Sequence, residues 1–62
     1  MLEKIALRQA VEALPERERM VINLRYFHAL TQQRVAAVMS ISQVQVSRIE
    51  KKALSLLRDL LA

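Results

Sequence analysis

The 62-residue chain contains no cysteine, no glycine, one proline and one histidine. The absence of cysteine excludes a disulfide framework and a thiolate metal site, and a lone histidine without such partners does not make a metal site. The absence of glycine excludes a Gly-rich phosphate-binding loop. Apolar runs fall short of the ~20 residues that cross a bilayer, and no secretory signal pattern is present. We therefore expect no metal, no cofactor and no membrane partner.

Catalysis also lacks its usual residues. There is no cysteine nucleophile, and the histidine is not at a plausible position to activate any of the serines. Glu16 and Glu18 lie in a charged run that is better explained as compensation of a helix dipole than as an acid–base pair. The sequence therefore predicts a protein that is not an enzyme.

Apolar residues make up 53% of the chain. Together with a single proline and no glycine, this composition is typical of a compact helical protein. A chain of this length forms one domain with one small core, and it buries only about 60% of its unfolded surface. The predicted fold is all-α, a small four-helix domain.

A first helix is predicted over residues 2 to about 13. Apolar residues at helical spacing form a stripe of Leu7, Ala10, Val11 and Leu14. A second apolar face is made by Leu2, Ile5, Ala6 and Ala13. A helix that is apolar on two faces needs a second surface to pack on besides its own domain, either a partner or a missing piece of a longer chain.

Pro15 predicts the boundary to a second helix, because it disfavours helical backbone before it and suits the first helical position. Glu16 and Glu18 then lie in the first turn, where carboxylates complement the helix dipole. This helix is expected to end near residues 27–28. Its predicted buried stripe is Met20, Val21, Leu24 and Phe27, flanked by Ile22 and Tyr26.

Residues 31–52 predict a helix-turn-helix within this domain, which spans residues 1–62. A third helix runs from about Gln32 to Met39 with Thr31 as its cap, and a fourth begins near Gln43. One buried seam joins them through Val35, Ala36, Met39, Ile41, Val46 and Ile49. Farther along the fourth helix, the inner face is predicted to continue through Ala53, Leu56 or Leu57, and Leu60.

The turn contains serine where glycine is common. Two alternatives follow: either Ser40 has a left-handed backbone at a cost of about 1 kcal/mol, since only glycine adopts that conformation without strain, or the turn differs from the usual one. Ser42 is an N-cap candidate for the fourth helix, because its hydroxyl can accept from a free backbone N–H.

The outer surface of the fourth helix carries side chains suited to base edges. The amide of Gln43 or Gln45 can pair with adenine N6 and N7, and we favour Gln43 because only one of them needs to face the groove. Val44 can touch a thymine methyl, and Ser47 can pair with a donor or an acceptor. Without an arginine directed at guanine, this set predicts an A/T-leaning half-site.

The net charge is +4. Residues 1–30 have five Lys/Arg and four Asp/Glu, and residues 31–62 have five and two, so the excess of +3 falls on the helix-turn-helix half. This favours a polyanionic partner. The candidates for phosphate contact are Arg25, Arg34, Arg48, Lys51 and Lys52. About four such contacts predict a log–log salt slope of roughly −3 to −4.

Two of the charged residues have a plainer alternative. Arg34 and Arg58 are also compatible with a solvated basic face that pairs within its own helix. Glu50 is expected to pair with Arg25 or with a basic neighbour and to aim that residue at the DNA backbone.

Three segments resemble one known family. They are ISQVQVSRIEK at residues 41–51, LPERERMVINLRYF at residues 14–27 and EKKALSLL at residues 50–57. Together they resemble region 4 of the sigma-70-type RNA polymerase sigma factors, and SQVQVSR followed by acidic-Lys-Lys is closest to the sporulation and stress-response branch, the sigma-F type. The resemblance covers nearly the whole chain.

This resemblance implies the C-terminal domain of a sigma factor, which holds the −35 promoter element in the major groove and docks on the β flap of RNA polymerase. It implies base reading by Gln43, Val44 and Ser47. It implies phosphate or activator contacts by Arg48, Lys51 and Lys52, and phosphate contacts by Arg25 and Thr31. It further implies a bacterial cytoplasmic protein associated with the nucleoid, with an anti-sigma factor as another partner. The housekeeping branch has charged residues at the base-reading positions, so its −35 sequence does not transfer.

The end of the chain is rich in leucine, at Leu54, Leu57, Leu60 and Leu61. A chain of 62 residues cannot bury all of them, so partner docking, self-association through this helix or truncation from a longer chain is expected. This observation supports a second hypothesis, a protein-interaction module that docks on the β flap or an anti-sigma factor and binds DNA weakly alone. A third, the DNA-binding domain of a response-regulator or quorum-type regulator, is disfavoured by residues 14–27 and by the long fourth helix.

Overall fold

Helical segments follow one another along residues 2–62, the part of the chain that this computed structural model describes, with side chains described from residue 6. They are α1 (Leu2–Glu12), α2 (Glu16–Ile22), η1 (Asn23–Phe27), α3 (Gln32–Met39) and α4 (Gln43–Leu61). Residues 2–62 contain no strand, so the predicted all-α fold with a helix-turn-helix is confirmed. None of the described helices is both long enough and apolar enough to span a bilayer.

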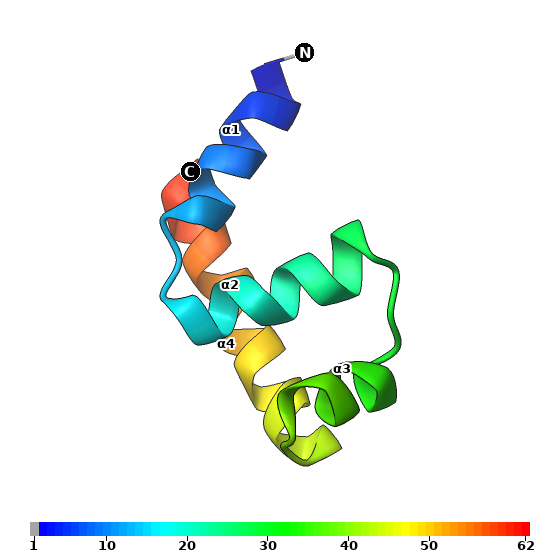
Figure 1. Cartoon of the computed structure of the whole chain (residues 1–62). Helices are drawn as coiled ribbons and strands as arrows, with labels where there is room; N and C mark the ends of the chain where they lie inside the picture. Colours follow the sequence, from blue (N-terminus) through cyan, green and yellow to red (C-terminus); the bar gives the residue numbers. More distant parts are fainter. Residues whose placement is uncertain (1) are drawn as a thin grey trace.

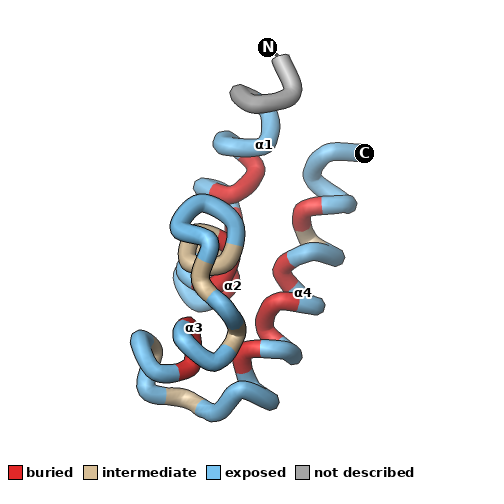
Figure 2. Tube along the Cα trace, turned by 90° about the vertical axis from the view of Figure 1, so that its right-hand side faces the viewer, coloured by how far each residue is buried: buried red, intermediate tan, exposed pale blue. Residues whose placement is uncertain are grey.

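The longest helix, α4, runs along most of the molecule, whose dimensions are 33 × 19 × 15 Å. Helix α1 lies against the C-terminal half of α4, α3 lies against its first turns, and α2 crosses between them (Figure 1). Buried positions recur along the side of α4 that faces these helices (Figure 2). The core is therefore two clusters, one at each end of α4.

The cluster between α1, α2 and α4, here called the α1 cluster, consists of Ala10, Val11, Leu14, Ile22, Ala53 and Leu57. The predicted first helix and the predicted continuation to Leu57 are confirmed. One prediction was wrong: Leu60 is 51% exposed, because it lies beyond Leu57, the last buried residue of α4. Leu7 of the predicted stripe is 37% exposed. Ala6 and Ala13 are also exposed. The side chains of Leu2 and Ile5 lie outside the described residues.

The second cluster, here called the helix-turn-helix cluster, joins α2, α3 and α4. Its buried members are Val21, Val35, Ala36, Val46 and Ile49, with Leu24, Leu30, Met39 and Ile41 packed against them. All six residues of the predicted seam belong to it, so that prediction is confirmed.

The predicted buried stripe of the second helix was partly wrong. Met20 is 44% exposed and Phe27 is 47% exposed, whereas Ile22 is buried. One reason is that α2 packs on both clusters, so the neighbouring Val21 and Ile22 each face one of them. The other is that η1 is a π-helical turn, in which the His28 N–H donates to the Asn23 carbonyl at 3.0 Å. This wider turn breaks the 3.6-residue spacing on which the prediction of Phe27 depended.

Candidate nucleic-acid interface

The turn between α3 and α4 is closed by backbone bonds. Ser40 has left-handed dihedrals, φ 58° and ψ 41°. The Ile41 N–H donates to the Ala36 carbonyl at 3.0 Å and the Ser40 N–H donates to the Ala37 carbonyl at 3.4 Å, which is a Schellman arrangement. The expected strain at Ser40 is thus present, and the two bonds help to offset it. The turn fixes how α4 leaves α3.

Both helices of the motif have side-chain caps. Thr31 Oγ1 accepts from the Arg34 N–H at 3.2 Å, which confirms the predicted cap of α3. Ser42 Oγ accepts from the Gln45 N–H, and Gln45 Oε1 accepts from the Ser42 N–H, each at 3.1 Å. This capping box confirms Ser42 as the cap and occupies the Gln45 carbonyl oxygen. Of these two glutamines, Gln43 is the one whose amide makes no side-chain hydrogen bond among the described residues.

The side chains expected to read bases are exposed on the first turns of α4. Gln43, Val44 and Ser47 are all exposed, and the Val44 exposure is 60%. Gln43 and Ser47 are four residues apart, so they lie in one row along the helix with Val44 beside it. An exposed valine between an amide and a hydroxyl gives this surface apolar contact as well as hydrogen-bonding capacity.

The expected cations surround this surface unevenly. Arg34, Arg48 and Lys51 are exposed. Lys52 is exposed as well, but it lies about 140° around α4 from Ser47, and its Nζ is 3.8 Å from the carboxylate of Glu18 on α2. This ion pair is weak, because the distance is long and the Lys52 side chain is 68% exposed to solvent. Lys52 therefore flanks the surface instead of sharing the row of Ser47.

A polar network centred on Glu50 joins three elements behind this surface. Arg25 Nε donates to Glu50 Oε1 at 2.9 Å, which confirms the expected pairing. Tyr26 Oη donates to Glu50 Oε2 at 2.8 Å, and Gln32 Nε2 donates to Glu50 Oε1 at 3.0 Å. Arg25 Nη1 also donates to the Leu30 carbonyl at 2.9 Å. The network thus ties η1 and the start of α3 to the middle of α4.

Two members of this network, Tyr26 and Gln32, were missed from the sequence. Their partner lies 24 and 18 residues away, so no local spacing indicates the contact. The available signal was Glu50 itself, on the inner face of α4 beside Ile49. A carboxylate in a core needs several donors, because burying an unpaired charge is unfavourable.

The network shifts the acidity of its members. Burial acts to raise the pKa of Glu50, but the hydrogen bonds from Arg25, Gln32 and Tyr26 outweigh burial, and the pKa is lowered. The hydrogen bond to Glu50 raises the pKa of Arg25, and it also raises the pKa of Tyr26. At neutral pH the centre of the network is therefore an ionised carboxylate facing a guanidinium.

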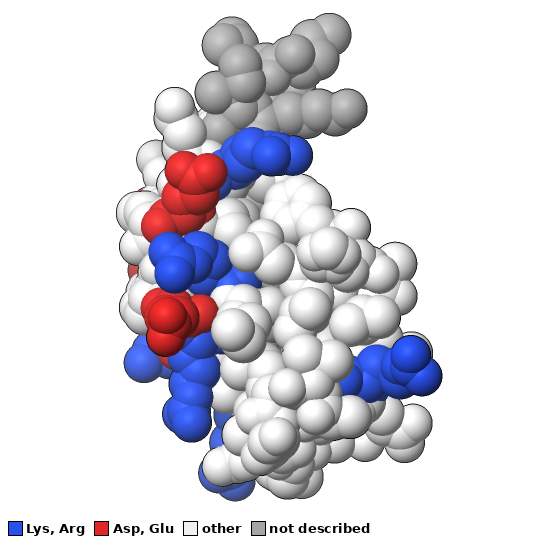
Figure 3. Space-filling view, viewed as in Figure 1, with Lys and Arg blue, Asp and Glu red and all other residues white. Residues whose placement is uncertain are grey.

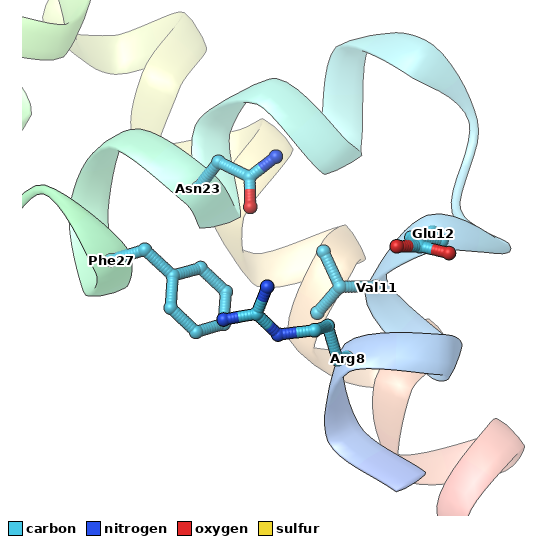
Figure 4. Close-up of a pocket in the computed structure, with 5 residues that line it drawn as sticks. All are labelled: Arg8, Val11, Glu12, Asn23 and Phe27. Atoms are coloured by element: carbon cyan, nitrogen blue, oxygen red, sulfur yellow. The ribbon is translucent and has the colours of Figure 1, made fainter. Parts of the chain in front are cut away.

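Beside this network, an apolar groove of about 340 Å³ opens between α1, η1 and α4. It is lined by Leu7, Val11, Ile22, Tyr26, Phe27, Leu54 and Leu57. At its edge, the guanidinium of Arg8 lies over the Phe27 ring, 5.9 Å from the ring centre (Figure 4). In the view of Figure 3, charged side chains gather toward the edges and uncharged side chains fill the middle. The groove itself, with its mainly apolar lining, suits an apolar partner better than a polyanion.

Comparison with known proteins gives one consistent result. The family model described as Sigma-70, region 4 matches residues 10–59. The RNA polymerase sigma-F factor of Priestia megaterium is 58% identical over 52 residues, which are 84% of this chain and 21% of that protein. The sigma-F factor of Bacillus subtilis is 54% identical over 84% of this chain and 20% of its own length. The sigma-G factor of Clostridium acetobutylicum is 47% identical over 86% and 21%. The chain thus spans about a fifth of the length of these relatives.

Proposed function

Because the chain belongs to the sigma-70 region 4 family, we propose that it binds the −35 promoter element and directs transcription initiation as part of an RNA polymerase sigma factor. The resemblance seen in residues 14–27 and 41–57, including its sigma-F character, is confirmed by the relatives. The proposed role is binding without catalysis, and its place is the bacterial cytoplasm at the nucleoid.

The observation that supports DNA binding best is the exposed row on α4. Gln43 and Ser47 face outward next to Val44, while the Schellman turn and the capping box fix the helix that presents them. A helix of this kind fits the major groove, where an amide pairs with adenine and a methyl group meets thymine. In this arrangement Arg25, Thr31 and Arg34 contact the backbone on one side. Arg48, Lys51 and Lys52 contact it on the other.

The test of this function is selection of binding sites from a pool of random duplexes. We expect an A/T-leaning half-site, and a G-rich core would overturn the assignment of the reading residues. Affinity for the selected duplex should fall with salt with a log–log slope of roughly −3 to −4, which corresponds to phosphate neutralisation by about four of these five cations. A flat salt response would contradict the assignment of the phosphate contacts.

A double substitution separates DNA reading from protein docking. Gln43→Ala with Ser47→Ala should abolish selectivity for the selected duplex and leave docking on RNA polymerase core unchanged. If the double variant keeps both properties, the interaction-module hypothesis replaces DNA reading as the function of the isolated chain. A matched control is Ser55→Ala, which removes an exposed hydroxyl from α4 far from the first turns.

A second function, docking on the β flap of RNA polymerase core, is supported by the apolar groove. Its lining includes Leu7, Phe27 and Leu54, which are large exposed apolar side chains on three different elements. Contiguous exposed apolar surface of this kind marks an interface. Leu7→Asp, on the α1 side of the groove, should abolish binding to the flap domain and spare DNA binding. If the variant keeps flap binding but loses binding to an anti-sigma factor, the groove is assigned to the anti-sigma factor. If it keeps flap binding but loses self-association in light scattering, the groove is assigned to a second copy of the chain.

A further inference from the structure

We propose that Glu50 is a positioning residue for DNA binding: it holds the guanidinium of Arg25 in one orientation toward a backbone phosphate, and Tyr26 and Gln32 hold Glu50 in turn. This inference rests on the proposed function, because it assumes that Arg25 meets a phosphate.

The hydrogen bonds leave Glu50 little freedom. Its side chain is 10% exposed, and its two oxygens accept from donors on η1 and on α3 while the residue itself belongs to α4. Tyr26 holds one oxygen, and Arg25 and Gln32 share the other. Rotation of the carboxylate would break bonds to all three donors.

Arg25 is fixed by two of its three nitrogens. Nε donates to Glu50 and Nη1 donates to the Leu30 carbonyl, so the plane of the guanidinium is set. Among the described residues no hydrogen bond engages Nη2, and the side chain keeps 27% of its exposure. The remaining donors are thus held next to Leu30, one residue before the cap of α3 at Thr31.

The network also adjoins the reading surface. A depression of about 230 Å³ is lined by Gln32, Ser47, Glu50, Lys51 and Leu54. Ser47 and Lys51 belong to the outer row of α4, whereas Gln32 and Glu50 belong to the network. The network and the row that is proposed to read bases therefore line the same depression and are neighbours on the surface.

Two physical effects of Glu50 on DNA binding have opposite signs. A carboxylate close to DNA repels phosphates, so its removal alone should tighten binding. A free arginine, however, loses rotamer freedom when it is immobilised on a phosphate, and Glu50 removes that entropy before DNA arrives. If positioning dominates, neutralising Glu50 weakens binding even though the protein becomes more positive.

The experiment compares the affinity of four variants for the duplex obtained by selection. Glu50→Gln and Tyr26→Phe should each weaken binding about three- to tenfold, which is the lower part of the range for coupled neighbours. The matched controls are Glu16→Gln, which removes an exposed carboxylate from α2, and Gln9→Ala, which removes an exposed amide from α1. Both controls should bind as the wild type does, or slightly more tightly for Glu16→Gln.

A second readout separates positioning from a general loss of structure. A set of duplexes is made, in each of which a different single phosphate is replaced by neutral methylphosphonate. The phosphate that Arg25 contacts is the one whose replacement weakens the binding of the wild type but not that of Arg25→Ala. Replacement of that same phosphate should weaken wild-type binding and have little effect on Glu50→Gln or Tyr26→Phe. Tyr26→Phe keeps the ring in place, so it reports on the network even if Glu50→Gln unfolds.

The outcomes distinguish this inference from the function on which it rests. A wild-type chain that binds no duplex overturns the proposed function and the positioning role with it. The positioning role alone is overturned if the wild-type chain binds the duplex and a folded Glu50→Gln or Tyr26→Phe variant binds it equally well or more tightly.

Discussion

An apolar cluster packs against each end of α4, but the N-terminal end is held by side-chain hydrogen bonds to other elements as well. All the side-chain hydrogen bonds among the described side chains lie near the N-terminal end, because they join residues within 25–50. At the C-terminal end, Ala53 and Leu57 pack on α1 through apolar contacts, and Leu60 and Leu61 remain exposed. Apolar packing thus holds both ends of the helix, and directional hydrogen bonds are added at the N-terminal end.

This difference matches the functions proposed for the two ends. Reading bases requires side chains held in one orientation, and hydrogen bonds supply direction where dispersion contacts do not. Docking a protein partner requires apolar area near the rim of a small core, and the α1 cluster leaves such area uncovered. We therefore expect substitutions in the α1 cluster to change stability more than DNA binding, and substitutions in the helix-turn-helix to change both.

The largest effect is expected from Leu57→Ala in the α1 cluster. Leu57 is buried, and truncating a buried leucine lowers the free energy of unfolding by about 2–4 kcal/mol. Urea denaturation measures this loss, and DNA affinity under conditions where the variant is folded should not change. Leu54→Ala, at a 41% exposed position of the same helix, is the control and should change stability by less than about 0.5 kcal/mol. Equal effects of the two would show that the α1 cluster is not a packed core.

Acid is the next way to distinguish the two ends, through Glu50. Its pKa is lowered in the folded chain from a reference value of 4.5, so its contribution to stability is fully present above that value. The contribution is lost as the pH falls through the folded pKa, because the unfolded state then binds the proton more readily. The difference in unfolding free energy between wild type and Glu50→Gln should therefore shrink below pH 4.5. A difference that is constant down to pH 2 would contradict an ionised Glu50 in the network.

The capping box offers a smaller effect within the helix-turn-helix. Ser42→Ala should lower the free energy of unfolding by about 1 kcal/mol, because the Gln45 N–H in the first turn of α4 loses its acceptor. Thermal unfolding measures the change. Ser55→Ala, in the exposed middle of α4, should be neutral or stabilising, because alanine is the better helix former. The reverse order would mean that Ser42 is not the cap.

The smallest effect expected is a gain from Ser40→Gly. Glycine adopts the left-handed backbone of this turn without strain, but it also loses more freedom on folding, so the net gain should be about 0.5 kcal/mol. Ala29, with φ 56°, should respond in the same direction. Ala37→Gly in α3 is the control and should destabilise by about 1 kcal/mol. A lower melting temperature of Ser40→Gly would show that a contact of the serine side chain stabilises the fold by more than the backbone strain destabilises it.

The helix-turn-helix was predictable because its signals are local. Thr31 and Ser42 stand at the starts of helices, Ser40 stands in the turn, and the apolar seam follows helical spacing on both sides. The α1 side was less predictable because several leucines fit the same periodicity, and the relative placement of α1 and α4 decides which of them are buried. The exposure of Phe27 followed from the π-helical turn, which has no signal in residue spacing.

The site was predictable residue by residue but not as an assembly. The exposure of Gln43, Val44 and Ser47 follows from their positions opposite Val46 and Ile49 on α4. The choice of Gln43 over Gln45 gains support from the capping box, which the sequence indicated through Ser42 alone. The convergence of Tyr26 and Gln32 on Glu50 depends on how α3 and η1 pack against α4, and that arrangement arises only in the folded chain.

The most direct test of the account is a map of backbone amide chemical shifts on titration with the selected duplex. The account predicts that the largest changes fall in residues 43–48, at the first turns of α4, and in residues 31–34, at the start of α3, while α1 stays unchanged. Changes concentrated in α1 and in the last turns of α4, with residues 43–48 unaffected, would contradict it.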